Sequence, residues 1–124
     1  MKLGNVVNAL PALQKLAGEN LTPKTLYWVS KTLSKLDGEI NFFNDERAKI
    51  AKELGNEVET DKWEIPVENR PEFERRMVDL LNVEIEAEFK VVKLPVTENI
   101  RLSYNDLRML DGFVELELAE DDEN

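Results

Sequence analysis

Residues 23–54, PKTLYWVSKTLSKLDGEINFFNDERAKIAKEL, decide the fold. Their apolar residues are separated by alternating steps of three and four, a heptad spacing sustained for about four repeats. This series, the seam, is Leu26, Val29, Leu33, Leu36, Ile40, Phe43, Ile50 and Leu54, with Arg47 as its one interruption. Thr22 and Pro23 suit a helix start, and Gly55 suits a helix end. The pattern predicts one helix over residues 23–54, about 48 Å long at 1.5 Å per residue.

A chain of 124 residues cannot cover every side of such a helix. Either the seam contacts other helices of the same chain, or it forms an intermolecular coiled coil, and the sequence leaves both open. Trp28 and Phe42 lie off the seam and widen the apolar surface, although large aromatic residues favour a place in their own core. The predicted interaction residues are Leu26, Val29, Leu33, Leu36, Ile40, Phe43, Ile50, Trp28 and Phe42.

The residues before this helix predict a first, amphipathic helix. Leucine and valine recur at spacings of three and four from Leu3 to Leu16, and Gly18 follows. Pro11 interrupts the pattern, and proline cannot donate to the carbonyl four residues earlier. We therefore expect a kink near Asn8, or two short helices.

Shorter elements are predicted after Gly55. Residues 55–62 are polar and are expected to form a loop, and alternation from Trp63 to Val67 predicts a short strand. Asn69 with Glu72 resembles a capping box that opens a third helix, ending near Asn82.

The alternation of residues 83–91 predicts the clearest strand. Five apolar residues alternate there with Glu84, Glu86, Glu88 and Lys90. A second capping box, Ser103 with Asp106, predicts another helix, and residues 114–118 are either a final strand or the end of that helix.

These elements indicate an α+β fold, with a long amphipathic helix and shorter helices packed on a small antiparallel sheet. We expect one domain over residues 1–118 and a disordered acidic tail over 119–124.

The composition argues against catalysis. The chain has no Cys and no His, which removes the usual zinc ligands and the Ser-His-Asp and Cys-His nucleophilic machinery. The five glycines are scattered singly, so there is no glycine-rich phosphate loop. Glu84, Glu86 and Glu88 could in principle gather a divalent cation, but a solvated strand face is the better explanation, because glutamates opposite an alternating apolar face are what any half-buried strand shows. We expect no catalytic residue, no metal and no cofactor.

Charge is unevenly distributed along the chain. The net charge is −10; residues 1–54 hold eight basic and six acidic side chains, whereas residues 55–124 hold eight basic and twenty acidic ones. An acidic half argues against direct nucleic-acid binding and favours basic protein partners. Neither an apolar run of about 18 residues nor a signal peptide is present, so we expect a cytoplasmic protein and no membrane contact.

Several segments resemble a family of small uncharacterised proteins of tailed phages and prophages of Gram-positive bacteria. They cover most of the chain: residues 8–16 (NALPALQKL), 23–47, 68–73 (ENRPEF), 80–86 (LLNVEIE) and 102–107 (LSYNDL). The resemblance implies a viral context and no assigned activity.

Two functions compete within that context. The first is a structural or assembly component, or an assembly chaperone, that acts through the seam on a protein partner or on a second copy as a homo-oligomer. The alternative is an acidic inhibitor that mimics nucleic acid and occupies the basic groove of a host nucleic-acid-binding or defence protein.

Overall fold

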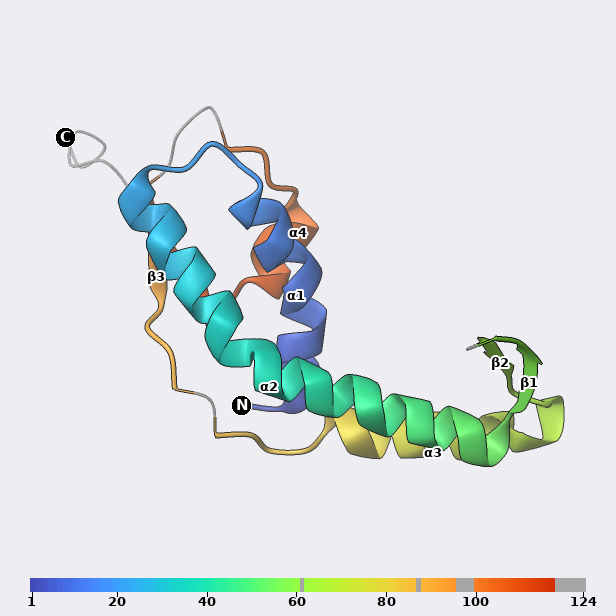
Figure 1. The fold of residues 1–124 in the computed structure, drawn as a ribbon. Helices are drawn as coiled ribbons and strands as arrows, with labels where there is room; N and C mark the ends of the chain where they lie inside the picture. The colour runs from blue at the N-terminus through green and yellow to red at the C-terminus, as the bar shows by residue number, and fades with distance from the viewer. Residues whose placement is uncertain (61, 87, 96–99, 118–124) are drawn as a thin grey trace. The chain divides into compact units, whose positions relative to one another are not determined.

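The computed structural model describes residues 1–60, 62–86, 88–95 and 100–117 and has an α+β fold (Figure 1). Its contacts divide the chain into two compact units. Unit 1 contains residues 1–7 and 38–86, and unit 2 contains residues 8–37 and 87–124. The single domain expected for residues 1–118 stays a prediction, and the acidic tail 119–124 lies outside the described residues.

The long helix is confirmed as α2, Pro23–Leu54. Thr22 caps its start: the backbone N–H of Thr25 donates to Thr22 Oγ1 over 3.4 Å. At the other end, Asn69 Nδ2 donates to the carbonyl oxygen of Leu54 over 2.8 Å. Asn69 therefore satisfies the end of α2 instead of forming a capping box, and the box predicted with Glu72 is wrong because the Asn69 side chain does not cap the helix that follows it.

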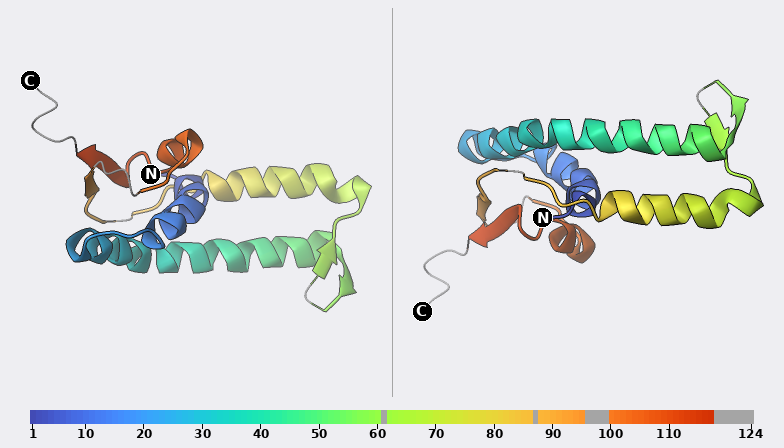
Figure 2. Two further views of the ribbon diagram at one scale, coloured as in Figure 1. Left: turned by 90° about the horizontal axis from the view of Figure 1, so that it is seen from above. Right: turned by 90° about the horizontal axis from the view of Figure 1, so that it is seen from below.

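In unit 1, the second half of α2 lies beside α3, Arg70–Leu81, with the two helices antiparallel (Figure 2). A short antiparallel hairpin, β1 (Asn56–Glu59) and β2 (Lys62–Glu64), and the 3-10 turn η1 (Val67–Asn69) connect them. The predicted loop over residues 55–62 thus includes strand β1. Leu3, Phe43, Ile50 and Leu80 form the buried core of this unit.

The beginning of the chain adds to unit 1 through backbone pairing. The N–H of Leu3 donates to the Val83 carbonyl over 2.8 Å, and the N–H of Ile85 donates to the Met1 carbonyl over 2.9 Å. Among the described residues of 83–91, Glu84 alone is bridged, to Lys2. The strand predicted for 83–91 is therefore wrong.

The reason is that two of its apolar residues, Ile85 and Phe89, pack in different units, while Val83 and Val91 are exposed. Ile85 packs against the core of unit 1, whereas the ring of Phe89 stacks on Phe113 in unit 2 with centroids 5.0 Å apart. Apolar and charged residues therefore alternate over residues 83–91 although the apolar ones do not share one buried face.

Unit 2 contains most of helix α1, Leu3–Ala17, and the first half of α2, with the parallel strands β3 (Val92–Pro95) and β4 (Val114–Glu117). The short helix α4, Tyr104–Met109, lies between these strands in the sequence. The capping box of Ser103 and Asp106 is confirmed. Of the two alternatives for residues 114–118, the final strand is confirmed as β4 and the helix extension is wrong.

Two further expectations about unit 2 differ from the structure. The sheet of this unit is parallel, because α4 and its connections let β4 return in the direction of β3. Helix α1 runs continuously through Pro11, so the alternative of two short helices is wrong, and the kink near Asn8 stays a prediction. Among the described residues, no helix is both long and apolar enough to cross a membrane.

Candidate interaction surface

The four seam residues that lie seven positions apart along α2, from Val29 to Ile50, are buried. Val29 and Leu36 are fully buried, and Phe43 and Ile50 are nearly so. Phe43 and Ile50 pack on Leu3 and Leu80 of their own chain. These four predicted interaction residues are therefore held in the interior of the protein.

The other predicted residues are less covered. Leu26 is 39% exposed and Phe42 is 45% exposed, while Leu33, Ile40 and Trp28 are half-buried. Next to the buried line of the helix, Thr25 and Thr32 occupy the buried positions in place of Leu26 and Leu33. The Thr32 hydroxyl donates to the Trp28 carbonyl over 3.0 Å, which satisfies this polar group in the interior. The buried stripe is thus turned by one residue from the predicted one.

The aromatic residues at the start of α2 have partners within unit 2. The ammonium group of Lys90 lies 4.6 Å from the centre of the Trp28 ring, and Tyr27 meets Trp28 edge to face with ring centres 5.1 Å apart. A cation over an indole face is a favourable contact. Trp28 therefore packs within its own chain, and Tyr27 remains 53% exposed.

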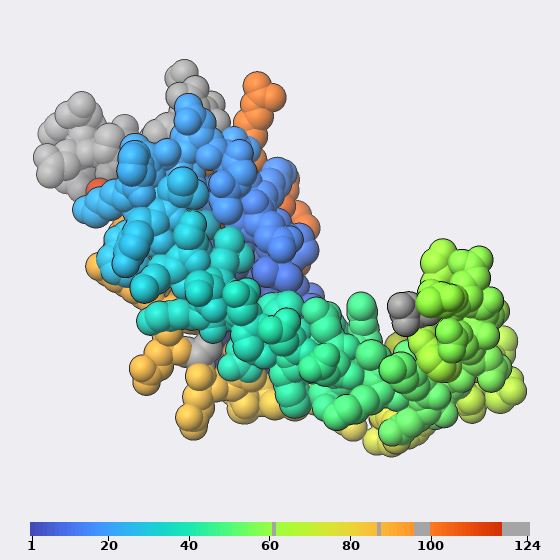
Figure 3. All heavy atoms as spheres, in the orientation of Figure 1, coloured from blue at the N-terminus to red at the C-terminus, as the bar shows by residue number. Residues whose placement is uncertain are grey.

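Unit 1 carries an open groove of about 550 Å³ between α2 and α3. In Figure 3, the second half of α2, in green, lies against α3, in yellow. The apolar residues that line the groove are Phe42, Ile50, Leu80 and Val83. Of these, Phe42 is 45% exposed and Val83 is 40% exposed. The charged residues that line it are Glu46, Lys49, Glu53, Arg75, Arg76 and Asp79.

The charges along this groove are paired. Lys49 contacts Glu46 over 3.1 Å, and Arg76 contacts Glu53, which joins α3 to α2. Arg75 bridges Glu72 and Asp79 within α3, over 2.6 and 3.3 Å. Glu72 lies outside the lining, which itself holds three cations and three carboxylates and so carries no net charge.

Hydrogen bonds shift the pKa values of three side chains beside α2, namely Glu72, Arg75 and Arg76. The hydrogen bond from Arg75 lowers the pKa of Glu72 below its usual value. Hydrogen bonds to Glu72 and Glu53 raise the pKa values of Arg75 and Arg76 respectively. A carboxylate that stays ionised at neutral pH does not suit general acid chemistry there, which calls for a raised pKa.

Sequence reasoning identified only Phe42 and Ile50 of this groove. It missed Val83 and the α3 residues, because no pattern shows which side of α3 lies beside α2. The spacing of Glu72, Arg75, Arg76 and Asp79 was a usable signal, since charges three or four residues apart pair on a helix.

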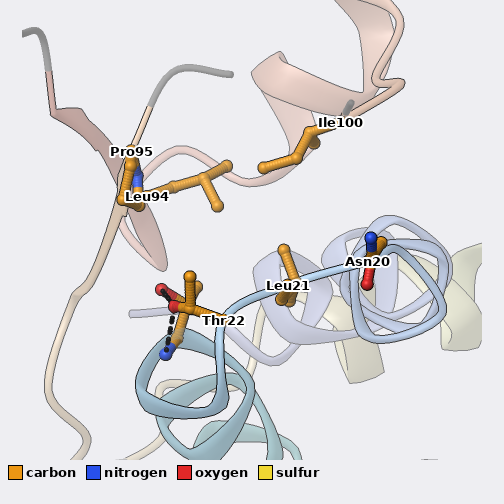
Figure 4. A pocket seen from close by; sticks show the side chains of 7 residues that line it. Asn20, Leu21, Thr22, Leu94, Pro95 and Ile100 are labelled. Carbon is orange, nitrogen blue, oxygen red and sulfur yellow. Dashed lines mark hydrogen bonds between the residues drawn. The ribbon is translucent and has the colours of Figure 1, made fainter. Parts of the chain in front are cut away.

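A second, much smaller pocket lies in unit 2 (Figure 4). Its cavity of about 50 Å³ has room for little more than water, and no charged side chain is among the described residues that line it. Leu21, Leu94 and Ile100 extend toward its interior, and Thr22 and Thr25 hydrogen-bond to each other over 3.1 Å. Its two hydroxyl groups are therefore paired with each other, and the described lining holds no base that could activate them.

Within the described ranges, no three His, Cys, Asp or Glu side chains converge as ligands for a metal ion. Comparison of the chain with protein families, curated proteins and solved structures found no match. The groove of unit 1, bordered by two helices and lined by four apolar residues, is the candidate site.

Proposed function

We propose that this is a non-enzymatic phage or prophage protein that acts by binding protein, as a structural or assembly component in the host cytoplasm. The proposal is supported by one observation above all: the α2–α3 groove combines an exposed aromatic residue, Phe42, with a rim of paired charges. Protein interfaces are built in this way, with apolar contacts at the centre and a polar rim.

The size and chemistry of the groove agree with a protein ligand. It is open and bordered by two helices, an arrangement that accepts the apolar face of another helix. The resemblance to phage proteins supplies the viral context. The net charge of −10 keeps the surface outside the groove hydrated.

The test is complementation of a phage or prophage from which the gene has been deleted. The deletion strain receives the wild-type gene, Phe42→Glu, or Tyr27→Glu as a matched control, because Tyr27 is an exposed aromatic residue on the same helix outside the groove. We expect the wild type and Tyr27→Glu to restore assembled particles, counted by electron microscopy. Phe42→Glu should not restore them at equal protein level. Full particle yield with Phe42→Glu would remove the groove from the function.

A second candidate, the acidic inhibitor of a host nucleic-acid-binding or defence protein, is favoured by the exposure of Glu84, Glu86 and Glu88. It predicts that a basic host protein binds the chain and that its affinity falls steeply with salt. Changing the three glutamates together to glutamine should then abolish binding. If binding persisted in this variant, the segment would not be the contact.

A further inference from the structure

We propose that the groove between α2 and α3 is covered by the same groove of a second copy of the chain, in an isologous interface. This inference rests on the proposed function and names its partner, since that function requires only that the groove bind protein.

The exposed apolar residues mark where the contact would lie. Phe42 and Val83 line the groove together with Ile50 and Leu80, which are already part of the core of unit 1. A partner at this position would therefore extend an existing core instead of creating a new one. Covering a large aromatic residue removes apolar area from water, the main favourable term in association.

Charge argues for a second copy over a basic partner. A basic protein is attracted to the acidic surface of the chain, but the groove offers it three cations for three carboxylates. A second copy carries net charge −10 and is repelled over most of the surface, so a groove without net charge is where it can approach.

The rim is also self-complementary. Arg75 and Asp79 pair with each other within α3 and are both exposed, so in a two-fold arrangement the arginine of one copy can also meet the aspartate of the other across the interface. The same surface on both copies thus supplies both halves of each ion pair.

This arrangement predicts an unusual salt dependence. Long-range repulsion between two acidic molecules weakens as the Debye length falls from about 10 Å at 0.1 M to about 3 Å at 1 M ionic strength. The apolar contact does not weaken in this way. The dimer should therefore become tighter as salt is raised, opposite to the binding of a basic partner.

The experiment is sedimentation equilibrium of the full chain across protein concentration, at 0.1 M and 1 M NaCl (about 10 Å and 3 Å of screening). Four proteins are compared: the wild type, Phe42→Glu, Phe42→Lys and Tyr27→Glu, each first checked for native helix content by circular dichroism. We expect a wild-type dimer with a dissociation constant lowered about tenfold or more by salt. Both Phe42 variants should be monomers and Tyr27→Glu a dimer.

The two Phe42 variants separate apolar contact from charge. Phe42→Lys reduces the net negative charge, so retention of the dimer in that variant would attribute association to charge and overturn the proposal. A wild type that is monomeric at both salts, or dimeric but unaffected by either Phe42 variant, would also overturn it. If the wild type is monomeric while Phe42→Glu still fails to restore particles, the groove binds another protein and the proposed function stands alone.

Discussion

At the scale of single residues, Asp106 joins two elements of unit 2. Its carboxylate accepts from Lys15 Nζ of α1 over 2.6 Å and from the backbone N–H of Ser103 over 3.0 Å. The hydrogen bond from Lys15 is the main reason that the pKa of Asp106 is lowered. The ionised carboxylate therefore stabilises the folded state.

The lowered pKa predicts a pH dependence of stability. The contribution of Asp106 is complete above its unfolded pKa of about 4 and is lost as pH falls through its folded pKa. Asp106→Asn should therefore be less stable than the wild type at neutral pH, with the difference shrinking toward about pH 2. Urea unfolding followed by Trp28 fluorescence in a Trp63→Phe background measures it. A difference that does not change with pH would contradict this role.

The other half of the capping box gives a second prediction. Ser103 Oγ accepts from the N–H of Asp106 over 3.0 Å at the start of α4. Ser103→Ala should destabilise the protein by about 1 kcal/mol. Ser34→Ala, at an exposed position within α2, is the control and should be neutral or slightly stabilising. Equal effects of the two changes in thermal unfolding would exclude a specific cap.

At the scale of elements, two glycines of the α2 region should respond oppositely to alanine. A Cβ on Gly55 would lie 2.7 Å from the Ala51 carbonyl oxygen and 3.0 Å from that of Glu64, so backbone would have to move. A Cβ on Gly38 would meet nothing within 4 Å. Gly38→Ala should stabilise by roughly 0.5–1 kcal/mol, because glycine lowers helix stability, and Gly55→Ala should destabilise. Destabilisation by Gly38→Ala in thermal unfolding would contradict the open space around it.

Element bounds were predictable where a local signal marks them. Thr22 and Ser103 mark helix starts through hydrogen bonds to residues three positions further on, and the structure confirms both starts. Gly55 does follow the end of α2 as predicted, but it is not in the left-handed conformation that favours glycine. Asn69 shows the limit of such signals, because its side chain turned to a carbonyl fifteen residues earlier.

The candidate site was less predictable because it depends on packing between distant segments. Phe42 and Val83 border one groove only because α2 and α3 pack side by side. Heptad spacing alone could not place Thr32 inside and leave Leu26 outside, since the two belong to neighbouring lines of one helix.

At the scale of the whole molecule, α1 and α2 each supply residues to both units. A helix that belongs to two cores should couple their unfolding, as expected for one domain. Trp28 lies in unit 2 and Trp63 in unit 1, so the variants Trp63→Phe and Trp28→Phe report each unit separately. We expect coincident urea transitions; separate midpoints would mean two independent domains.

The central claim, that one groove covers another, is tested most directly by disulfide formation between single introduced cysteines. The natural chain has no Cys, so each variant has one reactive thiol. The groove variants are Glu46→Cys, Lys49→Cys and Val83→Cys, and Tyr27→Cys is the control outside the groove. Under mild oxidation at dilute protein concentration, we predict covalent dimers from at least one groove variant and none from Tyr27→Cys. Covalent dimers from Tyr27→Cys alone, or from no variant, would contradict the claim.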